Sequence, residues 1–172
     1  YTLIAISGYG HSTSYENYLG TLDAIKKLVL KFPNQKFISK LHPKDHKRYY
    51  YKLFDNHLPD NYQVIDNNDT GFSSMIYDWF QYCEVVITGG STVAVEAMTF
   101  NIPVITLDPL GELQEIDFIK ANCTIKTKDS DSLIFEYSRL LNSQKNYTEI
   151  LERASDYSQT MFYQKKSAKE EI

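Results

Sequence analysis

The fold of this chain is decided by residues 84–108, which read EVVITGGSTVAVEAMTFNIPVITLD. Residues 85–87 are apolar and β-branched, as in a buried strand, and the run stops at Gly89-Gly90. Helix-favouring residues with an apolar stripe follow, so we expect a helix over 91–100. A second apolar strand is expected over 104–107. Two buried strands joined through a helix predict a βαβ unit with parallel strands.

The rest of the chain alternates in the same way. Further short strands are expected at 2–7, 37–41, 62–65 and 123–126, and further helices at 16–32, 44–57, 73–83, 115–121, 129–141 and 147–163. This pattern predicts an α/β fold, a doubly wound (Rossmann-like) parallel sheet of about six strands with helices on both faces. We expect residues 1–164 to form a single domain and residues 165–172 to form a polar C-terminal tail.

Composition narrows the class of protein. A chain of 172 residues is long enough for one well-buried α/β domain, and its net charge of -4 argues against a nucleic-acid-binding surface. Cys83 and Cys123 lie in or beside apolar segments, which indicates packing, and no Cys/His spacing predicts a metal site. No apolar run approaches the roughly 20 residues that span a bilayer. We therefore expect a cytoplasmic domain.

The chain opens with Tyr1 rather than Met and is already inside an expected strand. This start indicates a domain cut from a longer, two-domain protein. Half of any site between the two domains would then lie outside this chain.

The turn at Gly89-Gly90 is the first candidate site. A glycine pair that opens a helix presents backbone N–H groups and the positive end of the helix dipole, which suits phosphate or carboxylate. Glu96 follows Thr92 by one helical turn, so its carboxylate could accept hydrogen bonds from two adjacent sugar hydroxyls. The alternative is a tight turn followed by an acid placed favourably near a helix start. From this stretch alone both interpretations stay open.

Two other loops leave the same edge of the predicted sheet. Lys40 and His42 end the strand 37–41, in a stretch with a local excess of positive charge, and His42 could donate to an anionic oxygen. The alternative is a solvated helix face with a turn histidine. The loop that ends the first strand could line a cleft or form a plain βα turn; it contains Gly8, Tyr9, Gly10 and His11. The loop 108–114 emerges there too and could touch a base or a sugar.

The sequence lacks the signatures of hydrolases with a nucleophile elbow, of dinucleotide-binding dehydrogenases and of P-loop proteins. Ser91 has no evident His/Asp partners and lies in no G-x-S-x-G elbow, so a hydrolase is disfavoured. The glycine patterns of dinucleotide-binding and P-loop proteins are missing as well.

Residues 79–92 (WFQYCEVVITGGST), with Val95-Glu96-Ala97-Met98 and Ile102-Pro103-Val104-Ile105, resemble the nucleotide-sugar-binding half of GT-B glycosyltransferases. The similarity covers about the last two thirds of the chain. Lys40-Leu41-His42-Pro43 is similar to the H-P motif of bacterial sialyltransferases, capsule Kdo transferases and glycerophosphate-polymer transferases. The chain departs at Glu84, where family members often have Asp, and the acid/base motif of the sialyltransferases belongs to the other domain.

The resemblance implies a role for each candidate. His42 would be the catalytic contact to the donor phosphate, and Glu96 would hold the ribose. The phosphate would also be bound by Lys40, Gly89, Gly90, Ser91 and Thr92. The donor would be a CMP-, CDP- or UDP-linked sugar, with no metal and no other cofactor.

The implied function is the donor-binding half of a glycosyltransferase in bacterial surface polysaccharide or capsule synthesis. Its partner would be an N-terminal acceptor-binding domain that carries the catalytic base, so this part alone should be inactive. The resemblance leaves open a peripheral association of the full protein with the inner membrane. Two alternatives stand beside it: a nucleotide-sugar 2-epimerase, and a non-catalytic α/β interaction module.

Overall fold

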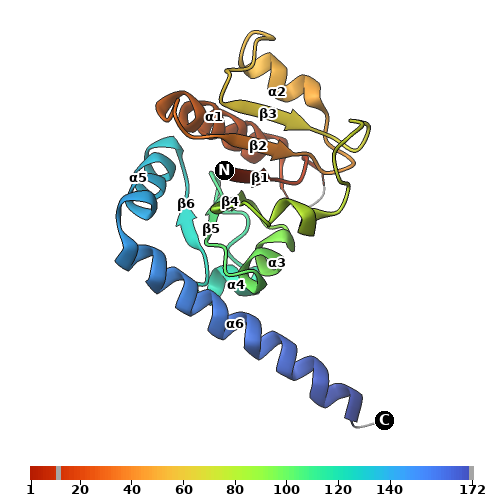
Figure 1. Cartoon of the computed structure of the whole chain (residues 1–172), viewed down its shortest axis with the longest axis vertical. Coiled ribbons are helices and arrows are strands. Elements are labelled where there is room, and N and C mark those ends of the chain that lie inside the picture. Colours follow the sequence, from red (N-terminus) through yellow and green to blue (C-terminus); the bar gives the residue numbers. More distant parts are fainter. Residues whose placement is uncertain (11–12, 171–172) are drawn as a thin grey trace.

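The computed structural model describes residues 1–10 and 13–170, with side chains described up to residue 161. Within these residues the chain forms one sheet of six parallel strands in the order β3-β2-β1-β4-β5-β6 (Figure 1). The strands are β1 (Thr2–Ala5), β2 (Phe37–Lys40), β3 (Tyr62–Ile65), β4 (Val85–Thr88), β5 (Val104–Leu107) and β6 (Ile125–Thr127). This confirms the predicted fold class. The strand order reverses between β1 and β4, where doubly wound sheets open a crevice.

Helices cover both faces of the sheet and bury two cores. One core packs under α1 (Tyr15–Lys31), α2 (Lys47–Leu53) and α5 (Ser130–Asn142). The other packs under η1 (Ile76–Trp79), α3 (Val93–Thr99), α4 (Asp117–Lys120) and α6 (Gln144–Glu170), whose far end runs clear of the domain (Figure 1). Leu3 joins the second core and its neighbour Ile4 the first, because successive strand residues face opposite sides. Both faces of the sheet are therefore buried, which explains the apolar runs in its central strands.

Three of the expected helices differ from the observed ones by three residues or more at an end. The segment 73–83 forms only the short 3-10 turn η1, because Ser73 bonds locally: its hydroxyl accepts from Met75 N at 3.1 Å and its carbonyl from Trp79 Nε1 at 2.9 Å. The helix expected at 44–57 is α2 alone, since it ends before Asp55 and Asn56, which have positive φ. Helix α6 continues to Glu170, through residues rich in good helix formers that were expected to be tail. No helix in the described part of the chain is long and apolar enough to cross a membrane.

Buried tyrosines are expected to make the folded chain less stable at alkaline pH. Burial raises the pKa of Tyr137 to about 12, and the Tyr137 hydroxyl lies 2.7 Å from Thr2 Oγ1. Above about pH 10 this tyrosine ionises in the unfolded chain but stays protonated in the folded one. Stability is therefore expected to fall by about 1.4 kcal/mol per pH unit for each such group as the pH rises towards 12.

Urea unfolding between pH 9.5 and 11.5 measures this slope. Tyr137→Phe should make it shallower by about 1.4 kcal/mol per pH unit, whereas Tyr82→Phe, at a ring that is 72% exposed, should leave it unchanged. Equal slopes in the wild type and Tyr137→Phe would contradict the assignment.

Candidate functional site

The crevice at the strand-order reversal holds a cavity of about 160 Å³, which we call the switch-point cavity. It is lined from the carboxyl ends of β1, β2 and β4 and from the loops after β3. The polar residues around it are Ser7, Lys40, His42, Asn67, Ser74 and Ser91. The structure thus brings together Lys40, His42 and Ser91, three of the residues singled out in the sequence.

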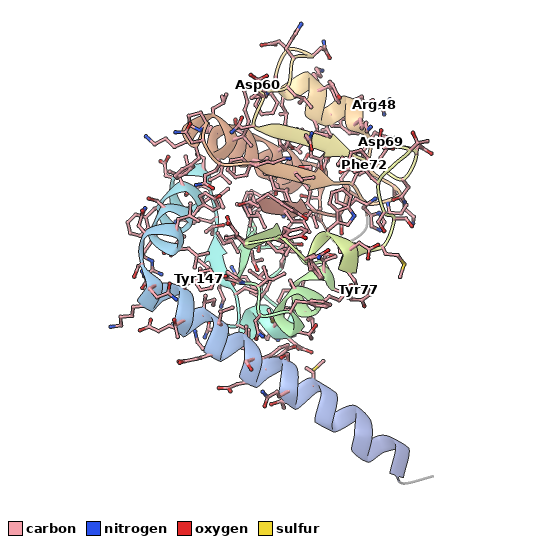
Figure 2. All side chains as sticks on the ribbon, in the orientation of Figure 1. Arg48, Asp60, Asp69, Phe72, Tyr77 and Tyr147 are labelled. Atoms are coloured by element: carbon pink, nitrogen blue, oxygen red, sulfur yellow. The ribbon has the colours of Figure 1, made fainter. Side chains whose placement is uncertain are left out.

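Lys40 is the buried cation of this cavity, with only 7% of the residue exposed. Its Nζ donates to Asn67 Oδ1. Burial lowers the pKa of Lys40, against the opposing effect of Asp66 and Asp69. Asp69, in the loop after β3 (Figure 2), is already paired with Lys47. The Lys40 ammonium is therefore removed from water and only partly compensated by nearby carboxylates. Binding an anion beside it would be strongly favourable.

His42 is oriented by the backbone of its own turn. Lys44 N donates to His42 Nδ1 at 3.2 Å, and Asp45 N donates to the His42 carbonyl at 2.9 Å. Because Nδ1 accepts a hydrogen bond, the neutral ring carries its proton on Nε2. In this tautomer Nε2 is the donor nitrogen of the ring, and an N–H donor is a group that suits a phosphate oxygen.

Ser91 and Thr92 supply backbone donors beside the cavity. Ser91 Oγ accepts from Val93 N at 3.3 Å, and Thr92 is the residue before α3 but caps it with no side-chain bond. Within the described residues, the N–H groups of Ser91 and Thr92 donate no hydrogen bond. These two amides are available to an anion at the start of the helix.

The paired glycines lie next to the switch-point cavity but do not line it. A Cβ added to Gly90 would come within 2.5 Å of Ile116 Cδ1 and 3.2 Å of Leu113 Cδ2, and one on Gly89 within 3.5 Å of Leu113 Cδ1. The close approach predicted at this pair is therefore made by side chains of the same chain. The adjoining void lined by both glycines holds about 20 Å³, room for a water molecule but not a phosphate.

Glu96 is half-buried on α3 and does not line the switch-point cavity. Its Oε1 lies 3.5 Å from Thr92 Oγ1, a long hydrogen bond. It forms no ion pair with any described residue. The ribose-binding role of Glu96 stays a prediction.

The loop after β5 is tied to the start of α1. Glu112 accepts from Ser14 N at 2.8 Å and from Thr13 Oγ1 at 3.2 Å, and Asp108 accepts from Asn17 Nδ2 at 3.2 Å. The side chains that were expected to touch a base or sugar therefore brace two neighbouring loops. A ligand would have to replace these bonds in order to use them.

The loop after β1 packs against the turn that carries His42. An added Cβ on Gly8 would lie 3.4 Å from Asp45 Cβ, Tyr9 is 44% exposed, and Gly10 has φ +87. His11 lies outside the described residues. Ser7 lines the switch-point cavity, but the described side chain of Tyr9 does not.

Sequence reasoning missed Asp45, the buried acid under this site. It accepts from Tyr18 OH and Tyr50 OH, both at 2.7 Å, and from His46 N at 2.8 Å. Asp45 thereby fixes the His42 turn to α1 and α2. An acid two residues after His-Pro, followed by the tyrosine run 49–51, was the available signal, but which tyrosines it pairs with becomes visible only in the tertiary structure.

Neither cysteine is placed to act as a nucleophile. Cys83 is half-buried, its Sγ donates to the Val85 carbonyl at 3.2 Å, and burial raises the pKa of its thiol to about 11 from an ordinary value of 9.0. Two pKa units lower the thiolate fraction about 100-fold.

At pH 8 we expect iodoacetamide to alkylate Cys83 at least 100-fold more slowly in the native chain than in urea, read by peptide mass spectrometry. Comparable rates in the two conditions would contradict this.

No group of three or more His, Cys, Asp or Glu side chains that could hold a metal ion occurs among the described residues.

No protein-family model and no curated protein sequence matches this chain. Solved structures do share its fold. The C-terminal domain of the glycosyl transferase group 1 protein LpcC from Francisella tularensis superposes with a TM-score of 0.63 at 18% identity, over 93% of this chain and 85% of that one. S. aureus MnaA, solved with UDP, gives 0.63 at 17% identity over 91% of this chain and 41% of that one.

Anabaena HepE, solved with UDP and glucose, gives a TM-score of 0.64 at 14% identity, over 92% of this chain and 43% of that one. This chain therefore spans less than half of the MnaA and HepE chains. At these identities the likeness establishes the fold. The chain has the Rossmann-like fold of GT-B glycosyltransferase C-terminal domains, which UDP-N-acetylglucosamine 2-epimerases share.

Proposed function

We propose that this chain is the donor-binding domain of a GT-B glycosyltransferase that builds a bacterial surface polysaccharide. The observation that carries the proposal is the convergence of Lys40, His42 and Ser91 on one cavity at the strand-order reversal. Ligands of doubly wound folds bind beyond the carboxyl ends of the strands, at this point. Because MnaA and HepE were solved with UDP, we take a UDP-linked sugar as the first candidate donor and CMP- or CDP-linked sugars as the others.

The groups present suit a departing nucleotide phosphate. Lys40 would supply a desolvated positive charge, His42 an Nε2–H donor, and Ser91 and Thr92 two backbone amides. Such donors, held in place before reaction, stabilise the charge that develops as the sugar–phosphate bond breaks. The base that activates the acceptor would come from the partner domain, so this chain should bind donor without completing transfer.

Calorimetry with UDP, CDP, CMP and GDP tests the proposal on the chain itself. One nucleotide should bind, and His42→Ala should weaken it about tenfold, the value of one hydrogen bond to a charged group. His57→Ala is the matched control, since His57 is exposed, does not line the switch-point cavity, and places its Nδ1 3.2 Å from the Asp55 carbonyl oxygen. If no nucleotide binds, or if both histidine variants behave alike, the proposed site is wrong.

A nucleotide-sugar 2-epimerase is the second candidate, because structures of UDP-N-acetylglucosamine 2-epimerases share the fold at TM-scores of 0.59–0.62. The full-length protein separates the two candidates. An epimerase would interconvert UDP-N-acetylglucosamine and its C2 epimer with no acceptor present, which proton NMR follows directly. A transferase would leave the sugar configuration unchanged until an acceptor is supplied.

A further inference from the structure

A second concave surface lies between α1 and α2, away from the switch-point cavity. This groove holds about 660 Å³. Tyr15 and Leu19 of α1 and Tyr49 of α2 contribute its aromatic and apolar lining. Tyr15 is 44% exposed and Leu19 is 43% exposed, so both present apolar surface to the groove that the domain does not cover. Tyrosine suits such a place because its ring offers a flat apolar face and its hydroxyl stays wet.

The basic side chains of the groove are Lys26, Arg48 and Lys52. The Arg48 guanidinium is held over the Tyr49 ring at 4.9 Å and donates to Tyr49 OH at 3.0 Å. Arg48 lies on α2, at the end of the molecule far from α6 (Figure 2). A guanidinium stacked in this way keeps its planar set of donors in a defined position, which favours recognition of a carboxylate or phosphate.

Acidic side chains also line the groove. Asp23 forms an ion pair with Lys27 at 2.7 Å, which leaves Asp55 as the acid to set against three cations. The groove is thus locally basic in a chain whose net charge is -4. Carboxylates beside cations and tyrosine rings match a ligand that combines anionic groups, hydroxyls and apolar ring faces. They disfavour a flat anionic membrane, which would face Asp55 as well as the cations.

Tyr9 connects the groove to the crevice. Its ring packs edge-on against Tyr15, with centroids 5.0 Å apart, and its hydroxyl lies 3.2 Å from that of Tyr49. Tyr9 lies two residues after Ser7, which lines the switch-point cavity. From Tyr15 to Lys26 the groove extends about 16 Å along α1, from the rise of an α-helix. The groove therefore has room for a short oligosaccharide that leads away from the crevice.

We propose that the groove between α1 and α2 binds an anionic glycan chain, with Tyr15 and Tyr49 against its sugar rings and Arg48 and Lys52 on its carboxylate or phosphate groups. The choice of a glycan rests on the proposed function. The glycan would be the growing polymer, held along α1 while its end reaches the crevice.

The test uses tetragalacturonic acid as a carboxylated probe and maltotetraose as a neutral one, each titrated into the 15N-labelled chain at low salt. The acidic probe should shift amides of α1 and α2 and bind at least tenfold more tightly than the neutral one. Arg48→Ala with Lys52→Ala should weaken it at least tenfold, and Tyr15→Ala about fivefold. Arg48→Lys keeps the charge but not the planar donors, so it should recover only part of the loss.

Lys31→Ala with Lys36→Ala is the matched control, since it removes two exposed charges outside the groove and should change binding less than twofold. If the acidic probe shifts no amides of α1 and α2, or if both double variants lose the same affinity for it, the groove is not a glycan-binding site. If the chain binds phosphatidylglycerol vesicles through Arg48 and Lys52 but does not bind the acidic probe, the glycan proposal is wrong and the groove is a membrane contact. Titrations with UDP, CDP, CMP and GDP run in parallel report on the switch-point cavity. Glycan binding without binding of any of these nucleotides would refute the proposed function and leave the glycan site in the groove standing.

Discussion

Replacing Asp45 with alanine is expected to lower the free energy of unfolding by about 3–5 kcal/mol, the loss typical of a broken buried polar network. Asp45 is 7% exposed and accepts from Tyr18 OH and Tyr50 OH, both at 2.7 Å. Without the carboxylate, both hydroxyls would stay buried and lose their partner. Burial already raises the pKa of Tyr18 and Tyr50, so neither can relieve the loss by ionising.

Urea unfolding of Asp45→Ala, Asp45→Asn and Asp60→Ala measures this effect. The amide of Asp45→Asn can still accept from one tyrosine, so its loss should be about 1–2 kcal/mol. Asp60→Ala, at an exposed loop acid (Figure 2), should change stability by less than about 0.5 kcal/mol. If Asp45→Ala behaved like Asp60→Ala, the network would not be a stabilising feature. Asp45→Asn, if folded, also shows whether the His42 turn needs this anchor, through its affinity for nucleotide.

Lys40→Met should separate binding from stability. Loss of a buried charged donor is expected to weaken nucleotide binding about 10- to 100-fold. The same change removes an ammonium whose pKa is lowered by burial, so the free energy of unfolding at pH 7 should rise by about 1 kcal/mol. A lowered folded-state pKa means that protonation opposes folding. The gain in stability should therefore shrink as the pH rises through the folded-state pKa of Lys40.

Calorimetry and urea unfolding of Lys40→Met, with Lys36→Met as an exposed control on the same segment, read both quantities. If Lys40→Met binds nucleotide as tightly as the wild type, Lys40 does not contribute to the nucleotide site. A variant that loses both affinity and stability would show that Lys40 is structural, and the trade-off would then be wrong.

The layout of the crevice could be predicted because parallel strands leave little choice. Residues 85–87 form an apolar run typical of a strand buried on both faces, and residues 37–41 form the expected strand that leads into His42. Because parallel strands end at one edge of the sheet, the segments that carry His42 and Ser91 meet there. The expected helix at 73–83 was wrong because its apolar spacing is helical but its backbone is held by local bonds to Ser73. Periodicity cannot report that competition.

The glycine pair shows the same limit. Its small size was visible in the sequence, yet what fills the space above Gly90 depends on Leu113 and Ile116, more than 20 residues later in the chain. Asp45 likewise depends on Tyr18, which lies 27 residues earlier, near the start of α1. Which side chain occupies a given space is set by packing between elements, and local sequence does not contain that information.

The sequence by itself determined the alternation of strands and helices, and so the class of fold, because hydrophobic periodicity is a local property of the chain. The class of fold in turn indicated the sheet edge at which ligands of doubly wound folds bind. Only the tertiary structure decided which polar groups meet there. It placed Lys40, His42 and Ser91 on one cavity, set Glu96 aside from it, and assembled the Asp45 network and the tyrosine-lined groove. These juxtapositions arise because distant elements must pack without voids or unpaired buried groups, a condition on the whole molecule.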